Sequence, residues 1–141
     1  MTVHQISIFL ENKQGKLNEV LSLLAEENIR IIAATVADTT EFGIMRMIVS
    51  DPEKAYAILK AKNVSANLTD VLAIVTESRA GSFAHILNQF TQAGLNIEYM
   101  YCFSIKEKSI LILRTNNREN AREVIRLQNM DYICENDLSN L

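Results

Sequence analysis

The sequence lacks the features that mark several classes of protein. It contains only one proline, four glycines and two cysteines, and Cys102 and Cys134 have no metal-ligand spacing. We interpret both cysteines as small buried side chains in a reducing compartment and expect no metal site. No apolar run approaches the ~18 residues needed to span a bilayer, and the N-terminus lacks the pattern of a secretory signal. These absences predict a cytoplasmic protein without a membrane partner.

The chain also has no large excess of positive or negative charge. The net charge is −3 and the isoelectric point is about 5.4, so electrostatics give no case for binding nucleic acid or anionic lipid. The sequence has neither a phosphate-binding loop nor a dinucleotide fingerprint, and we expect no cofactor. An RNA-recognition domain would carry aromatic residues on its central strands. The segments predicted to be those strands, 44–49 and 110–113, have none, so we expect no nucleic-acid partner.

What the chain does contain is a repeat without gaps, at an offset of 66 residues. Gly15 matches Gly81, and the apolar residues that follow Gly15 return after Gly81. The first set is Leu17, Val20, Leu21 and Leu24, and the second is Phe83, Ile86, Leu87 and Phe90. A fixed period of this kind indicates one duplicated unit. The sequence therefore predicts two domains, residues 1–70 and 71–141.

Each half has the same succession of local patterns. In the first half they are a strand at 6–10, a polar turn at 12–15, a helix that starts near Leu17 and closes at Asn28, a strand at 29–37, a hairpin turn at 39–43, a strand at 44–49, a helix capped by Asp51 with Pro52 at its first position, and a short strand near 64–68. In the second half Gly94 closes the first helix, Asn117 caps the second, and the last strand falls near 132–134. This order is the α+β, ferredoxin-like βαββαβ unit, a four-stranded antiparallel sheet with two helices on one face.

Two segments are apolar at every position, 71–75 and 110–113. A strand that is apolar on both sides needs cover on both faces of its sheet. We therefore expect the face without helices to be covered by the other half or by another chain. No stretch of Pro, Gly or Ser separates Leu68-Thr69-Asp70 from Val71, so the halves should be tightly coupled.

These residues resemble tandem ACT domains, over about residues 5 to 136. The resemblance rests on a strand, a polar turn ending in Gly and a helix starting Gly-x-Leu/Phe, found twice, and on Gly94-Leu95-Asn96-Ile97 before a strand. It implies a regulatory module that binds an amino acid or another small metabolite between such domains. The contacts it implies are Asn12, Gln14, Gly15, Lys16 and Leu17 in the first half, and Ser78, Ala80, Gly81, Ser82 and Phe83, with Asn96 and Ile97 opposite, in the second.

The chain departs from the family pattern at both turns. The family commonly has Asp, any residue and Pro before the Gly, whereas here Asn12 and Ser78 stand for Asp, and Gln14 and Ala80 for Pro. Loss of the carboxylate weakens the case for pairing with an α-ammonium group. Physically, a helix N-terminus suits a carboxylate, and Gly lets backbone approach a ligand. The alternative is that Gly15 and Gly81 are only turn residues.

The halves differ most along one predicted strand. Tyr99, Tyr101 and Phe103 alternate and share a face, where the first half has Ala33, Thr35 and Ala37. Either the rings fill space above small residues, or Tyr99 and Tyr101 wall a pocket for a bulky ligand.

Catalysis has little support in the sequence. His4 and His85 lack a nucleophile or carboxylate at a motif spacing, His85 falls off the apolar stripe of its helix, and the matched Glu11 and Glu77 fit solvated strand ends. We predict a non-enzymatic sensor of a small molecule, most simply an amino acid, that forms a homodimer and regulates a separate enzyme or regulator chain. The alternative is an assembly module without a ligand.

Overall fold

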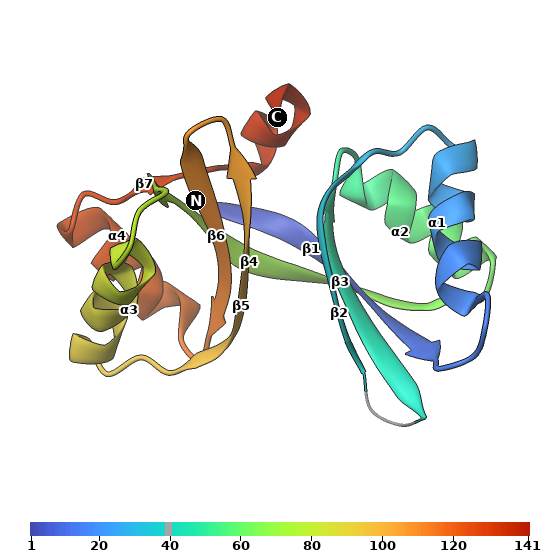
Figure 1. Ribbon diagram of the computed structural model, residues 1–141, viewed down its shortest axis with the longest axis horizontal. Coiled ribbons are helices and arrows are strands. Elements are labelled where there is room, and N and C mark those ends of the chain that lie inside the picture. Colours follow the sequence, from blue (N-terminus) through green and yellow to red (C-terminus); the bar gives the residue numbers. More distant parts are fainter. Residues whose placement is uncertain (39–40) are drawn as a thin grey trace. The chain divides into compact units, whose positions relative to one another are not determined.

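The computed structural model describes residues 1–38 and 41–141. Its elements, in chain order, are β1 (Thr2–Glu11), α1 (Lys16–Glu26), β2 (Ile31–Asp38), β3 (Phe42–Val49), α2 (Pro52–Ala61), β4 (Ser65–Glu77), α3 (Ser82–Gln92), β5 (Ile97–Ile105), β6 (Lys108–Thr115), α4 (Arg118–Leu127), β7 (Asp131–Tyr132) and the 3₁₀-helix η1 (Glu135–Asn140) (Figure 1). This order confirms the predicted pair of βαββαβ units. The predicted turn at 39–43 lies partly outside the described residues.

The chain divides into two compact units that exchange their ends. The N-terminal unit comprises His4–Asp70 together with Leu138–Leu141, and the C-terminal unit comprises Val71–Asp137 together with Met1–Val3. The guanidinium Nη1 of Arg30 donates to the carbonyl oxygen of Leu141 at 2.7 Å. In the other unit the amino group of Met1 donates to Sγ of Cys134 at 2.9 Å. The sequence patterns did not predict this exchange.

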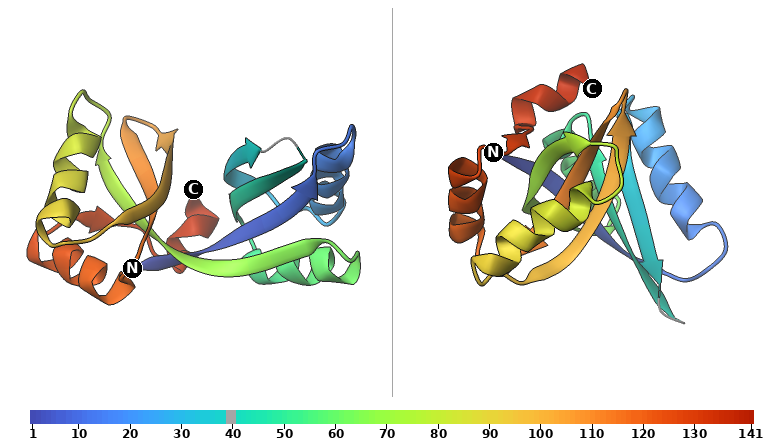
Figure 2. Two further views of the ribbon diagram at one scale, coloured as in Figure 1. Left: turned by 90° about the horizontal axis from the view of Figure 1, so that it is seen from below. Right: turned by 60° about the vertical axis from the view of Figure 1, so that its left-hand side comes forward.

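In the N-terminal unit the strands follow the order β2-β3-β1-β4. β3 pairs antiparallel with β1, where Ile6 faces Met47, and with β2, where Ala34 faces Met47. Both helices lie on one side of these strands (Figure 2). Alternate strand residues such as Ile8 and helix residues such as Leu24 and Leu59 are fully buried together in one core, because the two periodicities turn their apolar sides to the same layer.

The C-terminal unit repeats this plan with a shorter last strand. β4 pairs with β6 on one side and with β7 on the other, and β6 pairs with β5. Its core is built from Leu72 of β4, Phe90 of α3, Leu111 of β6, Ile125 of α4 and their neighbours, so these strands and helices contribute an apolar side to one layer. β7 is only two residues long.

One boundary differs from the prediction. The sequence suggested a strand near 64–68 and a second one from Val71, but β4 runs without interruption through 13 residues. The last strand of one repeat and the first strand of the next are thus a single strand. Leu68-Thr69-Asp70 contains neither Gly nor Pro, so nothing in this segment breaks an extended backbone.

The continuously apolar segments are buried on both faces, as predicted. Leu72 and Leu111 point to the helices, whereas Ala73 and Ile112 lie on the other face; each is at most 1% exposed. The two counterparts Leu17 and Phe83 differ in exposure: Leu17 is 39% exposed, whereas Phe83 is partly buried against the C-terminal core.

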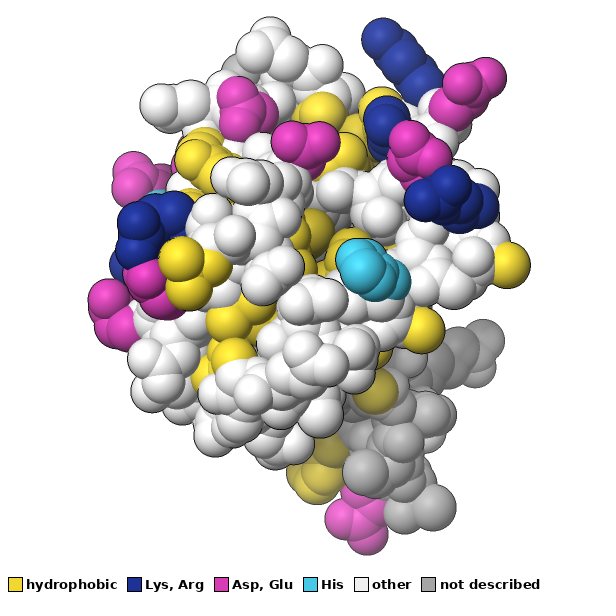
Figure 3. Space-filling model, turned by 90° about the vertical axis from the view of Figure 1, so that its left-hand side faces the viewer, with side chains coloured by type: hydrophobic (Ala, Val, Ile, Leu, Met, Phe, Trp, Pro, Cys, Tyr) yellow, Lys and Arg dark blue, Asp and Glu magenta, His cyan; other side chains and the backbone are white. Residues whose placement is uncertain are grey.

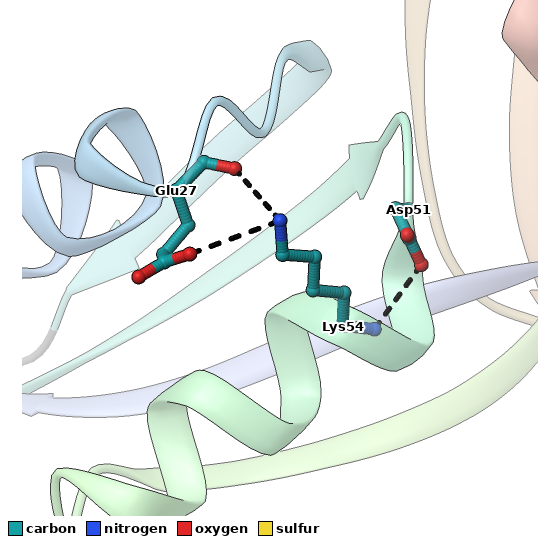
Figure 4. A network of polar contacts seen from close by, with 3 residues as sticks. All are labelled: Glu27, Asp51 and Lys54. Atoms are coloured by element: carbon teal, nitrogen blue, oxygen red, sulfur yellow. Dashed lines mark hydrogen bonds and ion pairs between the residues drawn. The ribbon is translucent and has the colours of Figure 1, made fainter.

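The second helix of each half begins at a side-chain cap, as predicted. Asp51 accepts from the backbone N–H of Lys54, and Asn117 accepts from that of Asn120, each at 3.1 Å. Lys54 also joins the two helices of its unit, since its Nζ donates to the carbonyl oxygen of Glu27 at 3.1 Å and lies 3.8 Å from the Glu27 carboxylate (Figure 4). These contacts fix where each helix starts.

The left-handed residues predicted after α1 and α3 are confirmed. Asn28 has φ 58° and Gly94 has φ 77°. In the part of the chain that the structure describes, no helix is long and apolar enough to cross a membrane. Within that part, no three His, Cys, Asp or Glu side chains gather in a way that could hold a metal ion.

Candidate functional site

The two turns that the sequence singled out have nearly the same backbone geometry. Gly15 and Gly81 each have φ 87° and each is the N-cap of its helix, with no side-chain hydrogen bond to the helix. The first turn of a helix leaves N–H groups without intrahelical acceptors, and these groups carry partial positive charge. Asp51 and Asn117 cap the N-termini of α2 and α4 with their side chains. The helices whose N-termini have no side-chain cap are therefore α1 and α3.

A cavity of about 670 Å³ lies beside the start of α3. We call it the α3 cavity, and it lies within the C-terminal unit. Its lining is Ile74–Glu77, Arg79–Ser82, His85, Ile86, Lys108 and Asn129–Asp131. Three predicted site residues, Ala80, Gly81 and Ser82, are part of this lining. In the view of the side that carries α3 and α4, apolar side chains lie recessed among polar atoms (Figure 3).

A second cavity of about 540 Å³ lies against the same turn. It includes Ser78 and Phe83, and it shares Ala80 and Gly81 with the α3 cavity. All five residues predicted from the turn of the second half therefore line one or both of these cavities.

Charged groups of both signs border the α3 cavity. The Glu77 carboxylate lies 3.8 Å from both Arg79 Nη1 and Lys108 Nζ, and those ion pairs are exposed. Asp131, in contrast, has no ion pair among the described residues. It belongs to β7, which follows α4 in the chain, and it lines the same cavity. His85 is exposed on the rim, as its position off the apolar stripe predicted.

The sequence patterns missed Asp131 as a site residue. It reaches the cavity because β7 pairs with β4, placing Asp131 opposite Val75. The signal that could have pointed to Asp131 is a difference between the two halves, because the matching position in the first half is Ser65. The acidic residue that the family pattern places before the Gly is absent, but Asp131 lines the same cavity.

The predicted residues of β5 lie elsewhere in the C-terminal unit. Ile97 faces Thr115, whereas Ile105, at the other end of β5, faces the cavity residue Lys108. The backbone N–H of Asn96 donates to Oδ1 of Asn116 at 3.1 Å, and Ile97 packs against the core. Within this unit, Asn96 and Ile97 are therefore not beside the turn of α3.

Tyr99 and Tyr101 form a half-buried row with Phe103. They face Arg114, Ile112 and Ile110 of β6, respectively. None of the three rings lines the α3 cavity or the neighbouring cavity. Their alternation on one face follows the prediction, and the choice between packing and a pocket wall stays open to the test of substituting them.

In the N-terminal unit the predicted residues form an exposed turn. The N–H of Asn12 donates to the carbonyl oxygen of Glu41 at 2.9 Å, and Gln14 and Gly15 are exposed. Lys13 Nζ lies 2.8 Å from the Glu11 carboxylate. This hydrogen bond and charge lower the pKa of Glu11 and raise the pKa of Lys13.

The rest of the first-half prediction concerns the start of α1. The ammonium group of Lys16 lies 3.7 Å from the Glu19 carboxylate, and Leu17 is exposed. A cavity of about 420 Å³ lies further along α1, lined by residues such as Asn18, Leu23 and Lys62. It contains no residue of the predicted site.

The complete chain, residues 1–141, matches the family described as the ACT domain pair. The chain belongs to this family. The crystal structure of protein BT0572 from Bacteroides thetaiotaomicron is 40% identical in sequence, with a TM-score of 0.95 over 100% of this chain and 98% of that one. ACT domains are regulatory modules, so the resemblance noted in the sequence is confirmed at the level of the family.

Structures with lower sequence identity share the fold. The regulatory subunit of aspartate kinase from Thermus thermophilus is 21% identical, with a TM-score of 0.65 over 89% of this chain and 90% of that one. The corresponding subunit from Thermus flavus is 20% identical, with a TM-score of 0.58 over 88% and 90%. A search of curated proteins found no match.

Proposed function

We propose that this ACT domain pair is a non-catalytic sensor of a free amino acid, and that the α3 cavity is its binding site. The observation that carries the proposal is that the uncapped helix start at Gly81 and the residue Asp131 line one cavity. A free amino acid has a carboxylate and an ammonium group. These groups match the positive helix end and the carboxylate, respectively.

The rest of the cavity supports a ligand of modest size. Ile74 and Ile86 are buried in its lining, and Met130 adds a flexible apolar side chain. The ligand carboxylate would accept from backbone N–H groups at the start of α3, while its side chain would lie against these three residues. Ala80 and Gly81 carry little or no side chain, which lets backbone approach the ligand closely.

The family and the site both favour regulation over catalysis. His85 is on the rim, and the nearby acid Glu77 is engaged by Arg79 and Lys108. We propose that ligand binding stabilises one arrangement of the protein and so changes its contact with a separate enzyme or regulator chain in the cytoplasm. The equivalent turn of the N-terminal unit lacks a counterpart of Asp131, so we propose that the second half carries the stronger site.

A second candidate function is assembly without a ligand. It is favoured by large apolar side chains that remain exposed on the N-terminal unit, among them Phe9 at 47% and Phe42 at 55%. Since Phe9 faces Ile44 and Phe42 faces Glu11 in the β1–β3 ladder, the two rings share one region of the sheet. Saturable binding of a metabolite separates this candidate from the sensor.

The test is a thermal-shift screen of the complete chain against the twenty amino acids, followed by calorimetry. Binding to the folded state alone stabilises it by ~2.7 kcal/mol at a hundredfold excess over the dissociation constant. We expect a selective hit, and we expect its amine without the carboxylate and its acid without the ammonium to bind at least ~10-fold more weakly. A flat panel with folded protein would reject the sensor and favour assembly.

A further inference from the structure

Two residues with hydroxyl groups lie directly opposite each other where β4 ends and β6 begins, beside the turn of α3. Thr76 of β4 faces Ser109 of β6 in the antiparallel ladder. Thr76 shares a strand face with the core residue Ile74, and Ser109 shares one with Leu111, because alternate residues of a strand point to the same side. Both side chains therefore lie on the side of the sheet that carries the helices.

Neither hydroxyl makes a hydrogen bond to a residue that the structure describes. Ser109 is only 6% exposed, and Thr76 is half-buried. Buried polar side chains are hydrogen-bonded in the large majority of cases, and hydroxyl residues opposite each other in a sheet often bond to one another. These two hydroxyls instead stay available to water or a ligand.

Both residues line cavities at the turn of α3. Thr76 lines the α3 cavity, and Ser109 lines the neighbouring cavity of about 540 Å³. Gly81 lines both cavities, and a Cβ added to it would meet no atom within 4 Å. A ligand in the α3 cavity can therefore extend past Gly81 towards Ser109.

The first half has no hydroxyl at the same two places. At the offset of 66 residues, Thr76 corresponds to Leu10 and Ser109 to Gly43, and Leu10 faces Gly43 in the β1–β3 ladder. Leu10 packs against the core of its unit. Since the same fold packs there with an apolar residue and a glycine, packing gives no reason for the polar pair of the second half.

We propose that Thr76 and Ser109 select the side chain of the ligand, and that the ligand is an amino acid whose side chain ends in a carboxamide or a hydroxyl group. This inference rests on the proposed function of the α3 cavity. The carbon atoms of the ligand side chain lie against Ile74, Ile86 and Met130, and its terminal group bonds to the two hydroxyls. A carboxamide or a hydroxyl suits them because each can both donate and accept.

Charged and apolar side chains fit this position less well. Burial of a charge without an opposite charge is costly, and the cations that border the α3 cavity, Arg79 and Lys108, already pair with the Glu77 carboxylate. An apolar side chain would shield the nearly buried Ser109 hydroxyl from water and leave it without a partner.

The test compares amino acids of similar shape that differ in the terminal group. Calorimetry on the complete chain would pair glutamine with methionine, asparagine with leucine, and threonine with valine. A site built to bond a polar group strongly rejects an analogue that lacks it, so we expect the polar member of at least one pair to bind at least ~10-fold more tightly. Glutamate and aspartate should bind more weakly than their amides.

These measurements separate the inference from the proposed function. If amino acids bind but the polar members have no advantage, or if glutamate or aspartate binds more tightly than its amide, this inference is overturned and the sensor stands. If no amino acid binds to the folded chain, both are overturned.

Two variants remove the hydroxyls and change little else. Thr76→Val and Ser109→Ala should each weaken binding of the preferred amino acid by ~5-fold or more, and should leave the affinity for its apolar counterpart unchanged or higher. Ser109→Ala should not lower the urea midpoint of the ligand-free chain, because the hydroxyl has no partner to lose. A lower midpoint would assign Ser109 a structural hydrogen bond and overturn its role in selection.

Thr115→Val is the matched control. Thr115 is a buried residue of the same strand, β6, and its hydroxyl oxygen accepts from the backbone N–H of Asn117 at 3.3 Å. Loss of this hydrogen bond should lower the urea midpoint, while the ratio of affinities for the polar and apolar amino acids stays as in the unsubstituted chain. An equal loss of selectivity in Thr115→Val would overturn the assignment to Thr76 and Ser109.

Discussion

At the scale of single residues, Gly81 and Gly94 mark the two ends of α3 with similar backbone conformations. Their φ angles are 87° and 77°, and a Cβ added to either would meet no atom within 4 Å. A side chain in this left-handed conformation costs roughly 1–2 kcal/mol whatever the space around it. Only Gly81 lines the α3 cavity. Substitution of Gly94 therefore measures the cost of backbone strain alone, whereas substitution of Gly81 also tests ligand binding.

We expect Gly81→Ala and Gly94→Ala to lower the free energy of unfolding by a similar amount, about 1 kcal/mol. Only Gly81→Ala should also weaken amino-acid binding, by ~10-fold or more, because its methyl group stands where the ligand carboxylate approaches. Urea unfolding and calorimetry would measure the two effects. Equal affinity in both variants would remove Gly81 from the site.

Asp131 is the residue-scale test of ammonium recognition. Replacing it by Asn keeps the size of the side chain and removes the charge, and a hydrogen bond to a charged group contributes ~1.5–3 kcal/mol. We predict a loss of amino-acid affinity of ~10-fold or more by calorimetry, with little change in stability because Asp131 is exposed. Glu53→Gln, on the exposed first turn of α2 in the other unit, should leave affinity unchanged.

At the scale of elements, the helices of each half start in two different ways. α2 and α4 begin at a side chain that accepts a backbone N–H, whereas α1 and α3 begin at a glycine without such a bond. In the first arrangement a side chain accepts a hydrogen bond from a backbone N–H group of the first turn. In the second arrangement these N–H groups stay available to water or a ligand. The duplication has kept this division of roles in both halves.

The cap of α4 predicts a stability effect without a binding effect. Asn117→Ala should lower the free energy of unfolding by about 1 kcal/mol, because an N–H of the first turn loses its acceptor. Asn120→Ala, in the same turn, removes an exposed side chain whose backbone N–H is the donor, so it should cost nothing measurable. Urea denaturation of both variants would check this; equal losses would contradict the role of the cap.

At the scale of the whole molecule, the two ends of the chain are exchanged between the units. Leu138 belongs to the unit of His4–Asp70 and is only 2% exposed, although β7 and Cys134 just before it belong to the other unit. The single strand β4 also passes from one unit into the other at Asp70. The halves are therefore joined both through β4 and through their exchanged ends.

Leu138→Ala should destabilise the N-terminal unit although residue 138 is remote in sequence. Removing a buried leucine side chain costs about 2–5 kcal/mol, and we expect hydrogen-exchange protection to fall in His4–Asp70. Leu127→Ala is the matched control, since Leu127 is 64% exposed and surface substitutions usually stay within about 0.5 kcal/mol. Loss of protection confined to 71–137 would contradict the exchange of ends.

Much of the fold followed from local patterns. The repeat, the order of elements, the caps at Asp51 and Asn117 and the left-handed residues Asn28 and Gly94 were all predictable, because each depends on residues within one or two turns of chain. The merged strand β4 was not predicted, since the hydrophobic pattern of two adjacent strands does not say whether a turn separates them.

The candidate site also contains residues that the sequence predicted and residues that it did not. Gly81 and its neighbours were recognisable from the repeated turn, although their role in binding stays a prediction. Asp131 was not recognisable, because a two-residue strand far along the chain carries it to the cavity through its pairing with Val75. No local pattern specifies such a pairing. The division into domains at residues 1–70 and 71–141 likewise stays a prediction.

The sequence by itself determined the duplicated βαββαβ plan and the two uncapped helix starts, because periodicity, glycine and capping residues act on their own neighbours. Only the tertiary structure decided that Asp131 joins the turn of Gly81, that the chain ends are exchanged, and that β5 stands at an edge with Cys102 exposed. These features depend on strand order and on contacts between distant segments, which are set by the packing of the complete chain.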